Sequence, residues 1–141
     1  MDTEATRRVR LAQRYFRRLV LANFQDRCAL TDIGTPELLV ASHIAPWSAD
    51  PHQRIRAANG LCLNRLHDAA FDRHLIIFDS EQRLLVSPRL RADLPDSPLA
   101  QALLRTEGAR LRAPVRRELD PLLLARHRQR FEEAQARRCF R

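Results

Sequence analysis

The chain has 141 residues, enough for one domain with an ordinary core, because 45% of them are apolar. All 25 basic residues are arginine, and with 17 acidic residues they give a net charge of +8. No apolar run approaches the ~20 residues that span a bilayer, and the N-terminus lacks the apolar segment of a secretory signal. The three cysteines are scattered and expected to be reduced, so we expect a cytoplasmic protein without a membrane segment.

The positive charge is concentrated in two flanks. Residues 1–31 carry seven arginines against three acidic residues, and residues 89–141 carry thirteen against seven, whereas residues 32–88 have a net charge of −2. A slightly acidic middle between two basic flanks suits a chemical site beside surfaces that hold phosphates. An arginine-rich composition with merely solvated charges explains the pattern equally well, so charge leaves both interpretations open.

The predicted elements alternate between helices and short strand pairs. Residues 3–25 carry apolar side chains at helical spacing behind a capping Thr3, which predicts one amphipathic helix. Two short extended runs, 28–31 and 37–42, flank a turn-forming sequence and predict a hairpin. The other predicted elements, in chain order, are a loop at 44–58, a turn at Asn59-Gly60, a helix at 64–71, a strand pair at 75–78 and 83–86, a proline-bearing connection, a helix near 98–106 and a helix at about 119–136.

The most informative residues are three short sequences in the middle of the chain. A predicted strand ends in Ser42-His43-Ile44-Ala45-Pro46-Trp47, Asn59 follows in a turn, and a predicted helix carries His67-Asp68-Ala69-Ala70-Phe71-Asp72. This arrangement resembles the HNH endonuclease family, in the subgroup with S/A-H-I-x-P-W and H-D-x-x-F-D motifs. The resemblance is dense over residues 8–90 and weaker in the helix that contains Arg126-His127-Arg128.

The resemblance implies an α+β fold built on a ββα-metal (His-Me finger) core. We expect this HNH nuclease core at about 27–90, preceded by the long N-terminal helix at 3–25 and followed by a helical C-terminal extension at 91–141. All of these parts are expected to form a single HNH endonuclease domain over residues 1–141.

The resemblance also assigns the catalytic roles. Phosphodiester hydrolysis needs an activated water and a metal ion on the scissile phosphate, and a neutral histidine can take the proton from that water. His43 is therefore expected to be the general base, Asn59 to bridge backbone groups across the loop, and His67 to present its imidazole to the metal. Each has a plainer alternative: a core or surface histidine, a simple Asn-Gly turn, and a helix histidine that binds no metal.

The expected metal site departs from the family pattern at Ser42. Many family members carry Asp or His just before the general base, and a serine is a weaker, neutral ligand. The ion is therefore expected on His67, the substrate phosphate and waters, which suits Mg²⁺, with Mn²⁺ or another transition metal as alternatives. Asp68 and Asp72 are nearby carboxylates that could supplement these ligands. The chain has no C-x-x-C pair, so no structural zinc is expected.

The predicted function is metal-dependent cleavage of phosphodiester bonds in double-stranded DNA. Guanidinium groups match phosphate oxygens, and the arginines expected to contact nucleic acid are Arg14, Arg17, Arg18, Arg54, Arg56 and Arg128. For these arginines a solvated charged face is the alternative. Two other functions remain open: a non-catalytic DNA-binding module of the same fold, which the weak ligand Ser42 favours, and an RNA-directed nuclease. Double-strand cleavage by one such site would need a homodimer or two successive nicks.

Overall fold

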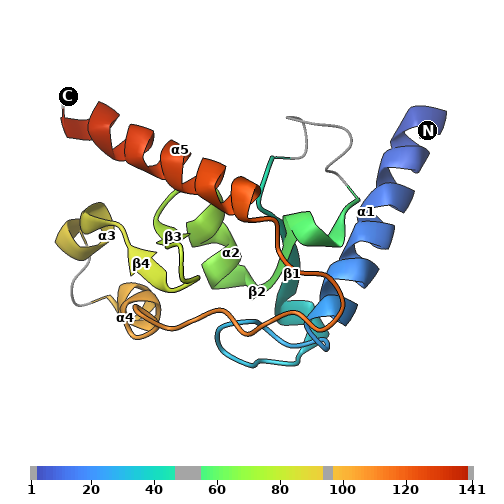
Figure 1. Ribbon diagram of the computed structural model, residues 1–141, viewed down its shortest axis with the longest axis horizontal. Helices are drawn as coiled ribbons and strands as arrows, with labels where there is room; N and C mark the ends of the chain where they lie inside the picture. Colours follow the sequence, from blue (N-terminus) through green and yellow to red (C-terminus); the bar gives the residue numbers. More distant parts are fainter. Residues whose placement is uncertain (1–2, 47–54, 94–96, 140–141) are drawn as a thin grey trace.

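The computed structural model describes residues 3–46, 55–93 and 97–139, and a ββα unit lies at its centre (Figure 1). The unit consists of β1 (Leu39–His43), β2 (Gly60–Asn64) and α2 (Arg65–Asp72). The two strands pair antiparallel, which places His43 opposite Gly60. Helix α2 starts directly after β2, because the Asn64 side chain caps it by accepting a hydrogen bond from the backbone N–H of His67 (3.0 Å). This order confirms the predicted α+β fold with a ββα core.

The long N-terminal helix, α1 (Glu4–Asn23), packs against β1 and β2. Thr3 caps it through a bond from the backbone N–H of Thr6 (3.1 Å), and the helix buries Phe16 and Val20, as the predicted helix at 3–25 requires. Gly60 makes the close packing possible. A Cβ atom there would overlap the Val20 side chain and lie 2.9 Å from Cζ of Phe16.

The C-terminal half adds a second antiparallel pair and three helices. They are β3 (Ile76–Phe78), β4 (Leu84–Val86), α3 (Pro88–Asp93), α4 (Pro98–Leu104) and α5 (Pro121–Cys139). The pairing of β3 with β4 and the helices α4 and α5 were predicted. The segment that forms α3 was predicted as a proline-bearing connection, and the structure corrects this. Its Pro88 is the first residue of the helix, where the backbone N–H that proline lacks would have no partner within the helix. Figure 1 shows α5 running over α2 and β3 from the middle of the molecule to the end opposite the start of α1.

The predicted hairpin of 28–31 with 37–42 is wrong. The first run is wound into a turn, in which the N–H of Asp32 donates to the carbonyl of Cys28 (3.0 Å), and only Ala29 donates to β2, at Cys62 (2.8 Å). The true partner of β1 is β2, in a segment predicted as a turn and the start of a helix. All five residues of β2 are buried, so its sequence lacks the alternation of polar and apolar residues that indicates a half-exposed strand.

The segment between α4 and α5 runs back across the ββα unit (Figure 1). Along it, Arg112 donates its backbone N–H to the carbonyl of Ala29, and Asp120 donates to that of Ala58, each at 3.0 Å. The hydrophobic core is continuous from Phe16 to Leu124. Among the described helices, none combines the length and the hydropathy needed to cross a membrane.

Candidate active site

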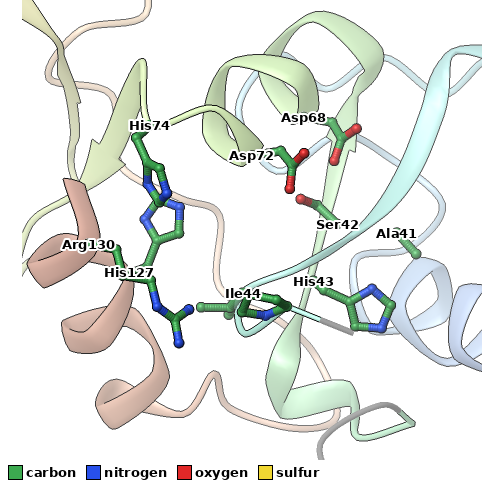
Figure 2. A pocket seen from close by; sticks show the side chains of 10 residues that line it. Ala41, Ser42, His43, Ile44, Asp68, Asp72, His74, His127 and Arg130 are labelled. Carbon is green, nitrogen blue, oxygen red and sulfur yellow. The ribbon is translucent and has the colours of Figure 1, made fainter. Parts of the chain in front are cut away.

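A cavity of about 340 Å³ opens between the end of β1, one face of α2 and the side of α5. Its lining includes Ser42 and His43 from β1, Asp68 and Asp72 from α2, and His127 and Arg130 from α5. Figure 2 shows the two carboxylates on one side of this pocket and the α5 side chains on the other. We call this cavity the β1–α2 pocket.

His43 is the last residue of β1, so the strand pairing determines where its ring can lie. The ring is half-buried and stacks on Phe16 of α1, with centroids 3.8 Å apart and planes 10° apart. It borders both the β1–α2 pocket and a smaller hollow beside α1. The stack depends on the close approach of α1 at Gly60, so a glycine in β2 indirectly positions the histidine of β1.

Asn59 makes the bridge that was expected of it. Its side chain is fully buried, at 0% exposure, and its Oδ1 accepts a hydrogen bond from the backbone N–H of Ala45 (2.7 Å). Its own carbonyl accepts from the N–H of Ile44 (2.9 Å). These bonds hold the chain that leaves β1 against the chain that enters β2. Asn59 therefore keeps the residues beside His43 in place.

Asp68 and Asp72 lie on the same face of α2. They are four residues apart, which places them roughly 40° from each other around the helix axis. The pKa of Asp68 is raised above its ordinary value. Burial is the main cause and the nearby Asp72 carboxylate adds to it, while a hydrogen bond from the Ser42 hydroxyl acts in the opposite direction. Two like charges and a hydroxyl therefore share one wall of the pocket.

This donor set fits a hard divalent cation. Carboxylate and hydroxyl oxygens are ligands of the kind that Mg²⁺ and Mn²⁺ accept, and Mg²⁺ keeps several waters when only a few protein oxygens are present. A cation there would also relieve the repulsion between the two carboxylates. Within the described residues, no three His, Cys, Asp or Glu side chains gather in a metal-binding cluster, so water and substrate oxygens would complete the coordination.

His67 lies on another face of α2 and does not line the pocket, in contrast to its expected place at the metal. It is 2% exposed, and burial lowers its pKa. The Thr106 hydroxyl donates to the carbonyl of Leu103, so it must accept from Nε2 of His67 (2.8 Å). Nδ1 then accepts from Nδ2 of Asn64 (3.0 Å). Both ring nitrogens are used within the protein, and no lone pair is left for a metal ion.

His127 brings α5 onto α2. It is 4% exposed and stacks on Phe71, with centroids 3.7 Å apart, and its Nε2 donates to the backbone carbonyl of Phe71 (2.9 Å). Burial lowers the pKa of His127 to about 4. Nδ1 is therefore unprotonated at neutral pH, and it has no partner in the described structure. His127 therefore has a packing role, in which it joins α5 to α2.

Three polar residues that line the pocket, His74, His127 and Arg130, are not among the candidate site residues expected from the sequence. Arg130 follows His127 by three residues on one helix, and that spacing places the two side chains on neighbouring parts of its surface. This spacing was the one available signal in the sequence. It indicates a shared site only once α5 is known to pack beside α2.

Two of the arginines expected to contact nucleic acid are bound to carbonyl groups of the protein. Arg17 donates to the carbonyls of Leu39 (2.7 Å) and Pro36 (3.0 Å), which ties α1 to the start of β1. Arg128 donates to the carbonyl of Phe78 (3.1 Å) and ties α5 to β3. Both are half-buried, so their main observed role is structural.

The other four arginines differ in their surroundings. Arg14 and Arg18 are exposed on α1, and they remain candidates for phosphate contact. Arg56 lies 3.8 Å from the carboxylate of Asp120, at the start of α5. Arg54 lies outside the described residues.

Comparisons with known proteins bear on the fold and on the segment that holds the core. Residues 28–79 match the sequence model of a family described as HNH endonuclease. A solved structure described as "Modification dependent TagI restriction endonuclease" superposes with a TM-score of 0.54 at 18% identity, over 79% of this chain and 35% of that chain. At that identity the likeness shows the fold, and the chain spans only about a third of the other protein. No curated protein matches. The matched segment contains the whole ββα core, with its strand-ending histidine and bridging asparagine, so this core is similar to that of the HNH endonucleases.

Proposed function

We propose that this chain is a metal-dependent endonuclease that cleaves double-stranded DNA, with His43 as the general base. The observation that carries the proposal is the β1–α2 pocket, where His43 and two carboxylates, Asp68 and Asp72, line one cavity of a nuclease-family core. The similar solved structure is that of a restriction endonuclease, which supports DNA as the substrate.

His43 would take a proton from the water that attacks the phosphorus atom. A general base must sit within hydrogen-bond reach of that water and hold its position. The end of β1, the stack on Phe16 and the bridge made by Asn59 restrict the ring in this way. Preorganisation of this kind lowers the entropic part of the barrier.

Asp68 and Asp72 would hold the divalent ion, with the Ser42 hydroxyl either as a further ligand or as a donor that orients Asp68. When bound, the ion polarises the scissile phosphate and stabilises the charge on the leaving oxygen. The proposal leaves His67 outside the ligand set, because its ring nitrogens bond to Asn64 and Thr106. Its part is to hold α2 in the orientation that turns the two carboxylates to the pocket.

The second candidate is a non-catalytic DNA-binding module of the same fold. The observation that favours it is Ser42, a neutral residue where many members of the family have a charged or imidazole ligand. Two carboxylates at i and i+4 supply the charge that Ser42 lacks. We therefore place the enzymatic function first.

A nicking assay tests the function. Supercoiled plasmid is incubated with the protein and Mg²⁺ or Mn²⁺, with EDTA as the control, beside RNA of matched sequence. We expect relaxed plasmid only when the metal is present, and little cleavage of the RNA. DNA binding without nicking under every metal condition would favour the binding module, and preferential RNA cleavage would favour an RNA-directed nuclease.

A further inference from the structure

We propose that Arg130 of α5 binds a phosphate of the polynucleotide substrate in the β1–α2 pocket. Arg130 lies outside residues 28–79, the segment that matches the nuclease family, so the helix that follows the core would complete the site. The proposal rests on the proposed nuclease function and specifies one of its substrate contacts.

Two side chains fix α5 where Arg130 can reach the pocket. His127 stacks on Phe71 and donates to its carbonyl, and Arg128 donates to the carbonyl of Phe78. These contacts join α5 to α2 and to the end of β3. Arg130 comes less than one turn after His127, so the same docking turns its side chain toward the pocket, as Figure 2 shows.

Charge makes Arg130 the residue suited to an anion. Among the described residues that line the pocket, it is the one side chain with a permanent positive charge. His127 cannot serve as a donor there, because its Nε2–H is bound to Phe71 and its Nδ1 is unprotonated. Arg130 as a whole is half-buried, and none of the ion pairs found in the described part of the chain involves it.

The arrangement of charges in the pocket suits a phosphodiester group. Asp68 and Asp72 on one wall would hold a cation against the phosphate, and Arg130 on the other wall would bind a non-bridging oxygen. A phosphate held from both sides is fixed in orientation relative to His43. The arginine would therefore contribute to substrate binding and to the alignment of the attacked phosphorus.

The test compares Arg130→Ala with Arg126→Ala. Arg126 lies on the same helix and carries the same charge, but it is exposed and does not line the pocket. In the nicking assay with Mn²⁺, we expect kcat/KM to fall by about tenfold to a hundredfold for Arg130→Ala, the range expected for loss of a charged hydrogen bond. Arg126→Ala should stay within about threefold of the parent, and Arg130→Lys should recover part of the loss.

A second measurement does not depend on cleavage. Binding of a labelled DNA duplex is followed by fluorescence anisotropy in a His43→Ala background with Mn²⁺, over a series of salt concentrations. Arg130→Ala should weaken binding by about tenfold. The slope of the logarithm of the binding constant against the logarithm of salt concentration should become shallower by about 0.9, the value for one phosphate contact. Thermal unfolding of each variant checks that α5 stays docked.

If Arg130→Ala and Arg126→Ala lose the same amount of activity or of affinity, in either assay, the proposal is overturned. Non-specific electrostatic attraction between arginine and the DNA backbone would then explain both results. A parent protein that binds the duplex but never nicks it would contradict the nuclease function, while the ratio of the two variants in the binding assay would still decide the role of Arg130. A parent that does neither would overturn both.

Discussion

Replacing His67 by alanine separates a structural histidine from a metal ligand. The substitution removes two side-chain hydrogen bonds, one from Nε2 to the Thr106 hydroxyl (2.8 Å) and one from Asn64 to Nδ1 (3.0 Å). It also leaves a cavity where a side chain of 2% exposure was packed. We therefore expect a loss of stability and not a selective loss of metal.

The magnitude follows from those contacts. Each buried hydrogen bond contributes about 0.5–1.5 kcal/mol, and the cavity adds about 1–2 kcal/mol. The Thr106 hydroxyl keeps its bond to the carbonyl of Leu103, which limits the penalty for an unpaired group. The free energy of unfolding should fall by about 2–5 kcal/mol, which lowers Tm by roughly 6–20 °C for a domain of this size.

The assay is thermal or urea unfolding in EDTA, beside Mn²⁺ titration calorimetry at a temperature where the variant is folded. Affinity for Mn²⁺ should stay within about threefold of the parent. A double-mutant cycle with Thr106→Val isolates the Nε2–Oγ1 bond and should give a coupling of about 1 kcal/mol. A His67→Ala protein with parental stability and much weaker Mn²⁺ binding would refute the argument and restore His67 as a ligand.

The other predictions concern the proposed general base, the two carboxylates of the pocket, the packing of α1 on Gly60, and the histidine that joins α5 to α2. His43→Ala should abolish nicking while duplex binding in Mn²⁺ persists; near-normal nicking would exclude His43 as the base. Asp68→Asn and Asp72→Asn should each weaken Mn²⁺ binding by at least about tenfold in calorimetry, and unchanged affinity in both would place the ion elsewhere. Gly60→Ala should lower the free energy of unfolding by about 1–3 kcal/mol in urea, because its Cβ would overlap the side chains of α1; a variant as stable as the parent would contradict this packing. Since burial lowers the pKa of His127 from 6.5 to about 4, the neutral ring stabilises the fold above pH 6.5, and this stability is lost as the pH falls toward 4. The loss at pH 4 should be on the order of 3 kcal/mol, and His127→Phe, which can keep the ring stack, should lose less stability between pH 7 and pH 4. Identical pH profiles for the parent and this variant would disprove the assignment.

Much of the fold could be predicted because its signals are local. Helical spacing and a threonine cap predict α1. The observed α2 starts at Arg65, one residue after the start of the predicted helix at 64–71, and Asn64 is its cap. The pairing of β3 with β4 follows from two short apolar runs joined by a turn. The pairing of β1 with β2 is not local, since a long intervening segment separates the strands, and a fully buried strand shows no alternation. Pattern alone therefore paired β1 with the wrong neighbour.

The site divides in the same way. The sequence by itself determined which residues belong to the motif, because His43, Asn59 and His67 follow one another at short spacings, with Asp68 directly after the last of them. Only the tertiary structure decided which face of α2 looks into the pocket. Phe71 and His67 are buried in the core, and successive residues of a helix are turned by roughly 100°, so Asp68 faces the pocket while its neighbour His67 does not. The tertiary structure also decided that α5 closes the pocket, because His127 meets the Phe71 carbonyl across 56 residues of chain, and no local pattern specifies a contact at that distance.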